Sequence, residues 1–261
     1  MKRTLILLMA LWCTIGSVDA KEKIKLACFG NSITEGSGVY DRITDSYPGV
    51  LQSMFGSDYE VRNFGIGAHT LMMRSDRPLM RTDLFRRALE WNPDIVTIKL
   101  GTNDSKRQNE RFIDTDFVHD LTFMIDLLQQ LPSHPKVYLC TPVPATAVQY
   151  NIHDSIIVNK EIPLIRKVAA DRGIEIIDLY TALKPYGDLF PDHIHPNEAG
   201  AVKIAETIYA AITGVVKEYS RPQYPGVKSE IDGFTAYSFP YWGRDVTVVM
   251  SKVSGDKNNP W

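Results

Sequence analysis

Residues 95–104 read Ile-Val-Thr-Ile-Lys-Leu-Gly-Thr-Asn-Asp, a short run of apolar and β-branched residues followed by a glycine and polar residues. A run of this length that ends at a turn residue is typical of a buried strand. Four other stretches have the same character. They lie at 25–29, 59–63, 137–140 and 174–178. The sequence therefore predicts five strands, of which 95–100 is the third.

Segments with helical spacing alternate with these runs. They cover 47–55, 79–91, 115–131, 155–172 and 197–212. Within 115–131, Leu121, Met124, Ile125 and Leu128 recur at three and four residues, which is the spacing of one buried helix face. Alternating strands and helices favour a mostly parallel sheet with right-handed crossovers. The predicted fold is α/β, a three-layer α/β/α sandwich around a five-stranded sheet.

The first twenty residues have the organisation of a secretory signal. Lys2 and Arg3 precede an apolar run at 5–15, and small residues at 18–20 suit a cleavage site. A membrane span needs about twenty apolar residues, so this run is too short to be one. The sequence predicts a chain that is exported to the periplasm or the cell exterior and has no integral membrane segment once it is mature.

The character of the chain changes after Gly214. A linker-like stretch with prolines and a glycine at 222–226 precedes two runs, 234–239 and 246–251, that suit a β-hairpin. An isolated hairpin is only marginally stable in water, so it either docks on the main domain or begins a second module. The predicted organisation is a signal peptide at 1–20, an α/β domain at 21–214 and a linker with a hairpin extension at 215–261.

Charge and cysteine content exclude several classes of partner and site. The formal net charge is −2 and no basic stripe stands out, which argues against a nucleic-acid partner. Cys13 follows the bulky Trp12, which argues against lipid attachment. Cys28 and Cys140 belong to different strands, and a strand between them would separate them by about twice 4.8 Å, beyond disulfide reach. We expect two buried free thiols and no metal site.

Four polar motifs follow the predicted strands, so they meet at the carboxyl edge of the sheet, where ligands bind in open α/β folds. The first motif spans 29–34. Gly30 allows a tight turn, and Ser32 directs its hydroxyl into the crevice and its backbone N–H towards a developing oxyanion. Taken alone, a serine after a strand is more often a helix cap.

The second and third motifs offer hydrogen-bond donors. The glycine-containing loop at 63–70 would present backbone N–H groups, although, taken alone, a plain strand-to-helix turn explains it better. His69 in this loop has no obvious carboxylate beside it to orient its ring. Asn103 follows the third strand, and its amide can donate a hydrogen bond to an oxyanion; taken alone, it would be a turn residue.

The fourth motif, at 192–197, contains an acid and a histidine three residues apart. One local turn can place the carboxylate of Asp192 against Nδ1 of His195, while Nε2 reaches Ser32. The rival interpretation is a metal site that uses His193 and His195. These histidines are only two residues apart and no His-Glu-x-x-His helix is present, so we expect no metal.

These four motifs, in this order, resemble those of the SGNH (GDSL-type) hydrolases over about residues 25–213. The resemblance implies a flavodoxin-like sheet and an esterase without a cofactor. It also implies Ser32 as nucleophile and oxyanion donor, Asn103 as side-chain donor, and Asp192 and His195 as the acid and base.

The sequence departs from the family pattern at two positions. Asn31 stands where the family motif has aspartate, which should matter little because that carboxylate is not the triad acid. Ala68 stands where a glycine usually supplies an oxyanion N–H, and alanine is expected to serve there if its φ is negative. Gly65 and Gly67 are the alternative donors.

The phrases Asn-Phe-Gly-Ile-Gly-Ala-His-Thr (63–70) and Leu-Gly-Thr-Asn-Asp-Ser-Lys (100–106) resemble sugar O-acetylesterases, including sialate O-acetylesterase-like members, more than lipases of the same superfamily. The expected substrate is therefore a glycan or a small-molecule ester. A thioesterase, lysophospholipase or arylesterase stays open, with Met72, Met73 and Leu79 either lining an acyl channel or filling the core. A non-catalytic glycan-binding module is the alternative from another class.

Overall fold

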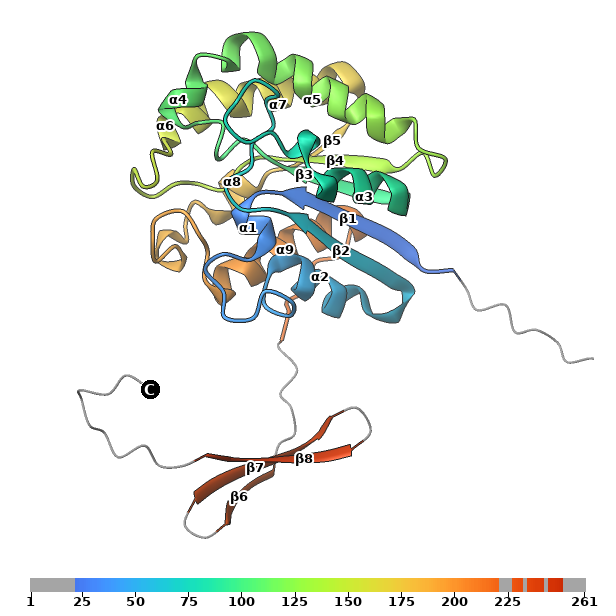
Figure 1. Ribbon diagram of the computed structural model, residues 1–261, viewed down its shortest axis with the longest axis vertical. Coiled ribbons are helices and arrows are strands. Elements are labelled where there is room, and N and C mark those ends of the chain that lie inside the picture. Colours follow the sequence, from blue (N-terminus) through green and yellow to red (C-terminus); the bar gives the residue numbers. More distant parts are fainter. Residues whose placement is uncertain (1–21, 221–226, 232–233, 242–243, 251–261) are drawn as a thin grey trace, which may run out of the picture. The chain divides into compact units, whose positions relative to one another are not determined.

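A computed structural model describes residues 22–220, 227–231, 234–241 and 244–250 (Figure 1). The predicted signal peptide at 1–20 lies outside these residues. The chain divides into two compact units, Met1–Tyr219 and Ser220–Trp261, and each is described by itself. Among the described residues, no helix has both the length and the apolar character that crossing a membrane requires.

The first unit is built on a five-stranded sheet in which every neighbouring pair is parallel. Its strands are β1 (Ile24–Gly30), β2 (Tyr59–Gly65), β3 (Ile95–Lys99), β4 (Lys136–Cys140) and β5 (Glu175–Ile177). All five predicted strands are present, and their order across the sheet is β2-β1-β3-β4-β5. This is the flavodoxin-like order, in which β2 is added on one side of β1 and β3, β4 and β5 are added on the other, so that the order of the strands reverses between β1 and β3.

Helices cover both faces of the sheet (Figure 1). The α-helices are α1 (Ser32–Glu35), α2 (Tyr47–Phe55), α3 (Asp83–Trp91), α4 (Arg107–Glu110), α5 (Ile113–Gln129), α6 (Asp154–Ile156), α7 (Ile162–Arg172), α8 (Leu179–Leu183) and α9 (Glu198–Thr213). Shorter 3-10 turns lie at Gly56–Asp58, Leu79–Arg81 and Gly187–Leu189, and a π-helical turn lies at Ile157–Glu161.

Two apolar cores fill the space between the sheet and its helices. Helices α3, α5 and α7 pack on one face, where the predicted stripe Leu121, Met124, Ile125 and Leu128 is buried. Helices α2, α8 and α9 pack on the other face, in a core that includes Tyr47. The three-layer α/β/α sandwich predicted from the alternation of strands and helices is confirmed.

Two predicted helices are interrupted. The segment 79–91 splits into a 3-10 turn and α3, because the Thr82 hydroxyl accepts a hydrogen bond from Phe85 N (3.1 Å) and caps a new helix. The segment 155–172 contains Pro163, which has no N–H to donate to the preceding turn. A π-helical turn, Ile157–Glu161, precedes the regular helix there.

The second unit is a three-stranded antiparallel sheet of β6 (Val227–Ile231), β7 (Phe234–Tyr241) and β8 (Arg244–Met250), in that order. The predicted hairpin corresponds to β7 and β8, although 242–243 lie outside the described residues. β6 was not predicted, because it follows a Pro-Gly pair and has apolar residues only at its ends.

Cys28 and Cys140 are both free and buried. Because β3 separates the strands that carry them, the expected separation beyond disulfide reach is confirmed.

Candidate active site

The four motifs meet at the carboxyl edge of the sheet, beside the point where the strand order reverses. Ser32 follows β1, Ala68 follows β2 and Asn103 follows β3, while His195 comes from the loop before α9. These four residues line one pocket of about 230 Å³. The fold therefore brings together residues that are up to 163 positions apart in the chain.

Ser32 is the first residue of α1. Asn31 caps this helix by accepting a hydrogen bond from Ile33 N (3.1 Å), so the first turn starts directly beneath the serine. Gly30 is required before it, since a Cβ at this position would come within 1.9 Å of Thr34 Oγ1. The tight turn between β1 and α1 thus fixes Ser32 at the carboxyl edge of the sheet.

A continuous chain of hydrogen bonds joins Ser32 to Asp192. Ser32 Oγ lies 2.8 Å from His195 Nε2, and His195 Nδ1 lies 2.6 Å from Asp192 Oδ2. The other carboxylate oxygen, Oδ1, accepts from the backbone N–H groups of Ile194 (3.0 Å) and His195 (2.6 Å). The backbone turn from Asp192 to His195 therefore also fixes the orientation of the Asp192 carboxylate.

The environment of Asp192 favours its charged form. Partial burial acts to raise its pKa, but hydrogen bonds from the His195 ring and from the N–H groups of His195 and Ile194 outweigh burial and lower it. An ionised carboxylate on Nδ1 keeps the proton at that nitrogen, which leaves Nε2 free to accept the proton of Ser32.

Ala68 has a left-handed backbone, with φ of 63°. The condition of a negative φ, under which alanine is expected to serve as donor, is therefore not met, and the left-handed conformation costs a non-glycine residue roughly 1–2 kcal/mol. Gly65 is not a free alternative, since its N–H donates to Asn63 Oδ1 (2.9 Å). Gly67 does not line the pocket, whereas Ala68 does.

Asn103 is almost completely buried and lies across the pocket from Ala68. Its Nδ2 donates to the backbone carbonyl of His69 at 3.0 Å. An amide nitrogen carries two N–H groups, so this bond orients the side chain and leaves a second donor. The predicted donors thus line the same pocket as Ser32.

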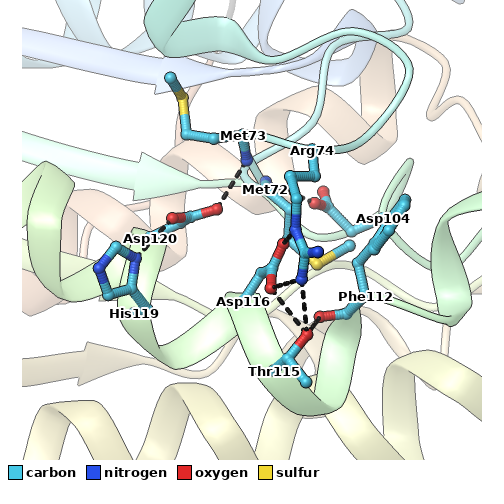
Figure 2. A network of polar contacts seen from close by, with 9 residues as sticks. All are labelled: Met72, Met73, Arg74, Asp104, Phe112, Thr115, Asp116, His119 and Asp120. Carbon is cyan, nitrogen blue, oxygen red and sulfur yellow. Dashed lines mark hydrogen bonds and ion pairs between the residues drawn. The ribbon is translucent and has the colours of Figure 1, made fainter.

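The loop that follows Ala68 is held by three buried carboxylates (Figure 2). Asp104 accepts from the N–H groups of Leu71 and Met72 at 2.9–3.0 Å. Asp120 accepts from Met73 N at 2.6 Å, and Asp116 pairs with the Arg74 guanidinium at 2.5–2.6 Å. We name residues 68–75 the carboxylate-held loop. Its anchoring was not predicted, because each acid lies more than thirty residues away in the sequence.

The other histidines near the pocket have different partners. His69 Nδ1 lies 2.8 Å from the carbonyl of Gly67, and no carboxylate among the described residues hydrogen-bonds its ring. His193 is exposed, and its Nδ1 lies 3.0 Å from Thr146 Oγ1. Within the described residues, no group of three or more metal-binding side chains occurs.

Four residues that line the pocket were not predicted from the sequence: Ser37, Lys106, Tyr150 and Ile152. Lys106 lies three residues after Asn103, and Tyr150 and Ile152 lie between β4 and α6. Met72 and Leu79 do not line this pocket and are fully buried in the core, so they do not form an acyl channel.

A larger hollow of about 780 Å³ opens elsewhere, along the edge strand β2 between residues of α2 and α3. It contains neither Ser32 nor His195. Its size is therefore no guide to the site of chemistry.

The sequence matches the GDSL-like lipase/acylhydrolase family over residues 28–203. It is also 42% identical, over 219 residues, to an acetylxylan esterase of Xylanibacter ruminicola. The aligned part is 77% of this chain but only 45% of that relative, so the chain spans less than half the length of the relative.

Solved structures with the same fold include an acetyl xylan esterase with a TM-score of 0.55 and 26% identity, covering 72% of this chain and all of that chain. The native aryl esterase of M. smegmatis has a TM-score of 0.60 and 20% identity, covering 73% of this chain and 99% of the other. At that level of identity the second likeness shows the fold alone.

Proposed function

Because the chain belongs to the GDSL-like lipase/acylhydrolase family, we propose that it is a serine ester hydrolase that removes acetyl groups from a carbohydrate. Ser32 is the nucleophile, His195 the general acid and base, and Asp192 the residue that orients His195. The observation that carries this proposal is the unbroken hydrogen-bond chain from Ser32 Oγ through both ring nitrogens of His195 to Asp192 Oδ2.

The reaction proceeds in two steps. In the first, Ser32 Oγ attacks the ester carbonyl while His195 Nε2 takes the hydroxyl proton, and the same imidazolium then protonates the departing alcohol oxygen. In the second, His195 takes a proton from water, the resulting nucleophile attacks the acyl-enzyme, and Ser32 recovers its proton as the acid leaves. Asp192 stays ionised throughout and stabilises the imidazolium.

The developing oxyanion is held by the backbone N–H groups of Ser32 and Ala68 and by Nδ2 of Asn103. No hydrogen bond of the described residues uses the N–H of Ala68, so it is available to a ligand. Removing one such donor typically costs about 10²- to 10³-fold in rate. We therefore assign the left-handed conformation of Ala68 to the aiming of this N–H.

A short acyl group on a sugar fits the pocket best. Its volume of about 230 Å³ is small, and its apolar lining comes from Ala68 and Ile152 rather than from an extended channel. The relative at 42% identity is named for its action on acetylated xylan. A thioesterase or lysophospholipase for long acyl chains would need a channel that Met72 and Leu79 do not provide.

The organisation of the chain completes the proposal. We infer that residues 1–20 direct export to the periplasm or the cell exterior, that 21–214 form the catalytic domain and that 215–261 form a separate extension. The reaction requires no cofactor or metal, since the nucleophile, base and donors come from the protein itself.

A panel of esters tests the proposed function. The natural chain and Ser32→Ala are compared on 4-nitrophenyl acetate, butyrate and octanoate, and on acetylated xylan with acetate release as the readout. We expect rates to fall with acyl length, acetate to be released from the polysaccharide and both activities to be lost in Ser32→Ala. Preference for octanoate would contradict acetyl specificity. The absence of all turnover would favour a binding module.

A further inference from the structure

Tyr150 is a large aromatic side chain that stays 55% exposed beside the proposed catalytic residues. Its ring centroid lies 5.7 Å from that of His195, with the rings inclined at 53°. Its hydroxyl donates to Asp192 Oδ2 at 3.3 Å, and its side chain lines the same pocket as Ser32. The residue thus forms part of the rim of the pocket rather than part of a core.

The backbone that presents Tyr150 is held in an unfavourable conformation. Tyr150 and Asn151 have φ values of 52° and 61°, both left-handed. For a non-glycine residue this conformation costs on the order of 1 kcal/mol or more, and it persists only where the surroundings impose it. Such strain is common at functional sites, and here it turns an aromatic ring towards the pocket.

A tight turn imposes that conformation, because Ile152 N donates to the Gln149 carbonyl at 2.9 Å and so closes the backbone over Tyr150 and Asn151. Contacts on both sides hold this turn in place. Asn151 Nδ2 donates to Gln108 Oε1 at 2.7 Å, and His153 N donates to Ser105 Oγ at 3.2 Å. On the other side, Thr146 N donates to the His193 carbonyl at 2.9 Å. The segment 145–154, which we name the tyrosine loop, therefore bridges the residues just after the third motif and His193 of the fourth motif.

We propose that Tyr150 is a sugar-stacking platform that determines specificity for an acetyl ester carried on a pyranose ring. This inference rests on the proposed function. It specifies the alcohol half of the ester substrate, which is a sugar in its pyranose form. A pyranose presents a face of C–H bonds, and a rigid aromatic ring offers a matching apolar surface at low entropic cost.

The layout of the pocket supports this assignment. A pocket of about 230 Å³ takes the acyl group, so the sugar lies against the rim, where Tyr150 is exposed. Lys106 and Ser37 line the same pocket and offer donors to sugar hydroxyls. A role confined to the hydroxyl bond with Asp192 would not require an exposed ring.

The test compares two acetyl esters that differ only in the alcohol: methyl xylopyranoside carrying acetyl groups, and ethyl acetate. Acid release gives kcat/KM for each, and the measured quantity is their ratio. Tyr150→Ala is expected to lower the ratio about tenfold, mainly through KM for the sugar ester. Tyr150→Phe, which keeps the ring but loses the hydroxyl, is expected to keep the ratio within about twofold.

Two further variants make the result interpretable. Val148→Ala removes another exposed side chain of the tyrosine loop that does not line the pocket, so its ratio should equal that of the natural chain. Tyr150→Leu keeps apolar bulk without an aromatic face, and it replaces Tyr150→Ala if thermal unfolding shows that the alanine variant does not fold. It is also expected to lower the ratio.

Equal loss on both esters in the ring-deleting variants would overturn the proposal, because the ring would then act only on His195. An effect of Tyr150→Phe as large as that of Tyr150→Ala would also overturn it, since the hydroxyl would be responsible. The natural chain could also turn over both esters, with Ser32→Ala inactive, while the variants of Tyr150 leave the ratio of the two kcat/KM values unchanged. That result would refute this inference but not the proposed function. A natural chain that turns over neither refutes the proposed function itself.

Discussion

The two loops that border the pocket are held in different ways. The carboxylate-held loop (68–75) has successive residues fixed by Asp104, Asp120 and Asp116, each at most 8% exposed. The tyrosine loop (145–154) is tied mainly by neutral hydrogen bonds, and it leaves Val148 and Tyr150 more than half exposed.

The difference corresponds to the tasks we propose for the loops. An oxyanion donor must be fixed within a fraction of an ångström, whereas a stacking surface tolerates small shifts of the sugar. Changes in the carboxylate-held loop should therefore affect stability and the turnover of every ester. Changes in the tyrosine loop should affect mainly which alcohol is accepted.

The largest effect is expected from Asp104→Ala. Deleting the carboxyl group leaves the buried N–H groups of Leu71 and Met72 without an acceptor, which should reduce the free energy of unfolding by about 3 kcal/mol. Urea unfolding at pH 5 measures this change. A loss below about 1 kcal/mol would show that Asp104 does not hold the loop.

A second effect of Asp104 depends on pH. Burial raises its pKa from 3.8 to about 7, an effect that the N–H groups of Met72 and Leu71 only partly offset. The folded protein therefore favours the protonated acid, whose contribution to stability is complete below about pH 3.8 and is lost as pH rises through about 7.

Asp104→Asn keeps an oxygen acceptor but removes this titration. Its free energy of unfolding, relative to the natural chain, should rise between pH 4 and pH 8 by on the order of 4 kcal/mol. Urea unfolding at intervals across that range gives the difference curve. A flat difference would indicate that Asp104 titrates normally in the folded protein.

Ala68→Gly is expected to stabilise the carboxylate-held loop by about 1 kcal/mol, because glycine adopts a φ of 63° without steric cost. Thermal unfolding measures the gain, and kcat on 4-nitrophenyl acetate should stay within about twofold if the N–H keeps its direction. A destabilised variant would mean that the Cβ of Ala68 makes contacts that outweigh the backbone strain.

The smallest effect is expected in the tyrosine loop. Val148 is 62% exposed, so Val148→Ser should change the free energy of unfolding by less than about 0.5 kcal/mol. The same urea experiment serves as the control for Asp104→Ala. A loss as large as that of Asp104→Ala would remove the distinction between the two loops.

Most of the fold could be predicted from local patterns, because most strands of the first unit are short, mainly apolar or β-branched runs and the long helices have an apolar face. The exceptions have local causes that the periodicity hides, namely the hydroxyl of Thr82 as a helix cap and the missing N–H of Pro163. β6 was missed because 227–231 has neither a continuous apolar run nor strict alternation.

The residues of the proposed site also divide into those that local sequence patterns could predict and those that they could not. Ser32, Asn103, Asp192 and His195 could be selected because each directly follows or precedes an element and has a residue type suited to one role. The sign of φ at Ala68 could not be predicted, since nothing in an alanine signals a left-handed backbone. The position of Tyr150 depends on Gln108 and Ser105, contacts more than forty residues away that no local pattern encodes.

The central claim is that His195 activates Ser32 for covalent attack. A fluorophosphonate, which reacts with activated serine hydroxyls, followed by peptide mass spectrometry, tests it directly. The account predicts a label on Ser32, no label in Ser32→Ala and a rate reduced by about 10²-fold or more in His195→Ala. Labelling of another residue, or undiminished labelling in His195→Ala, would contradict it.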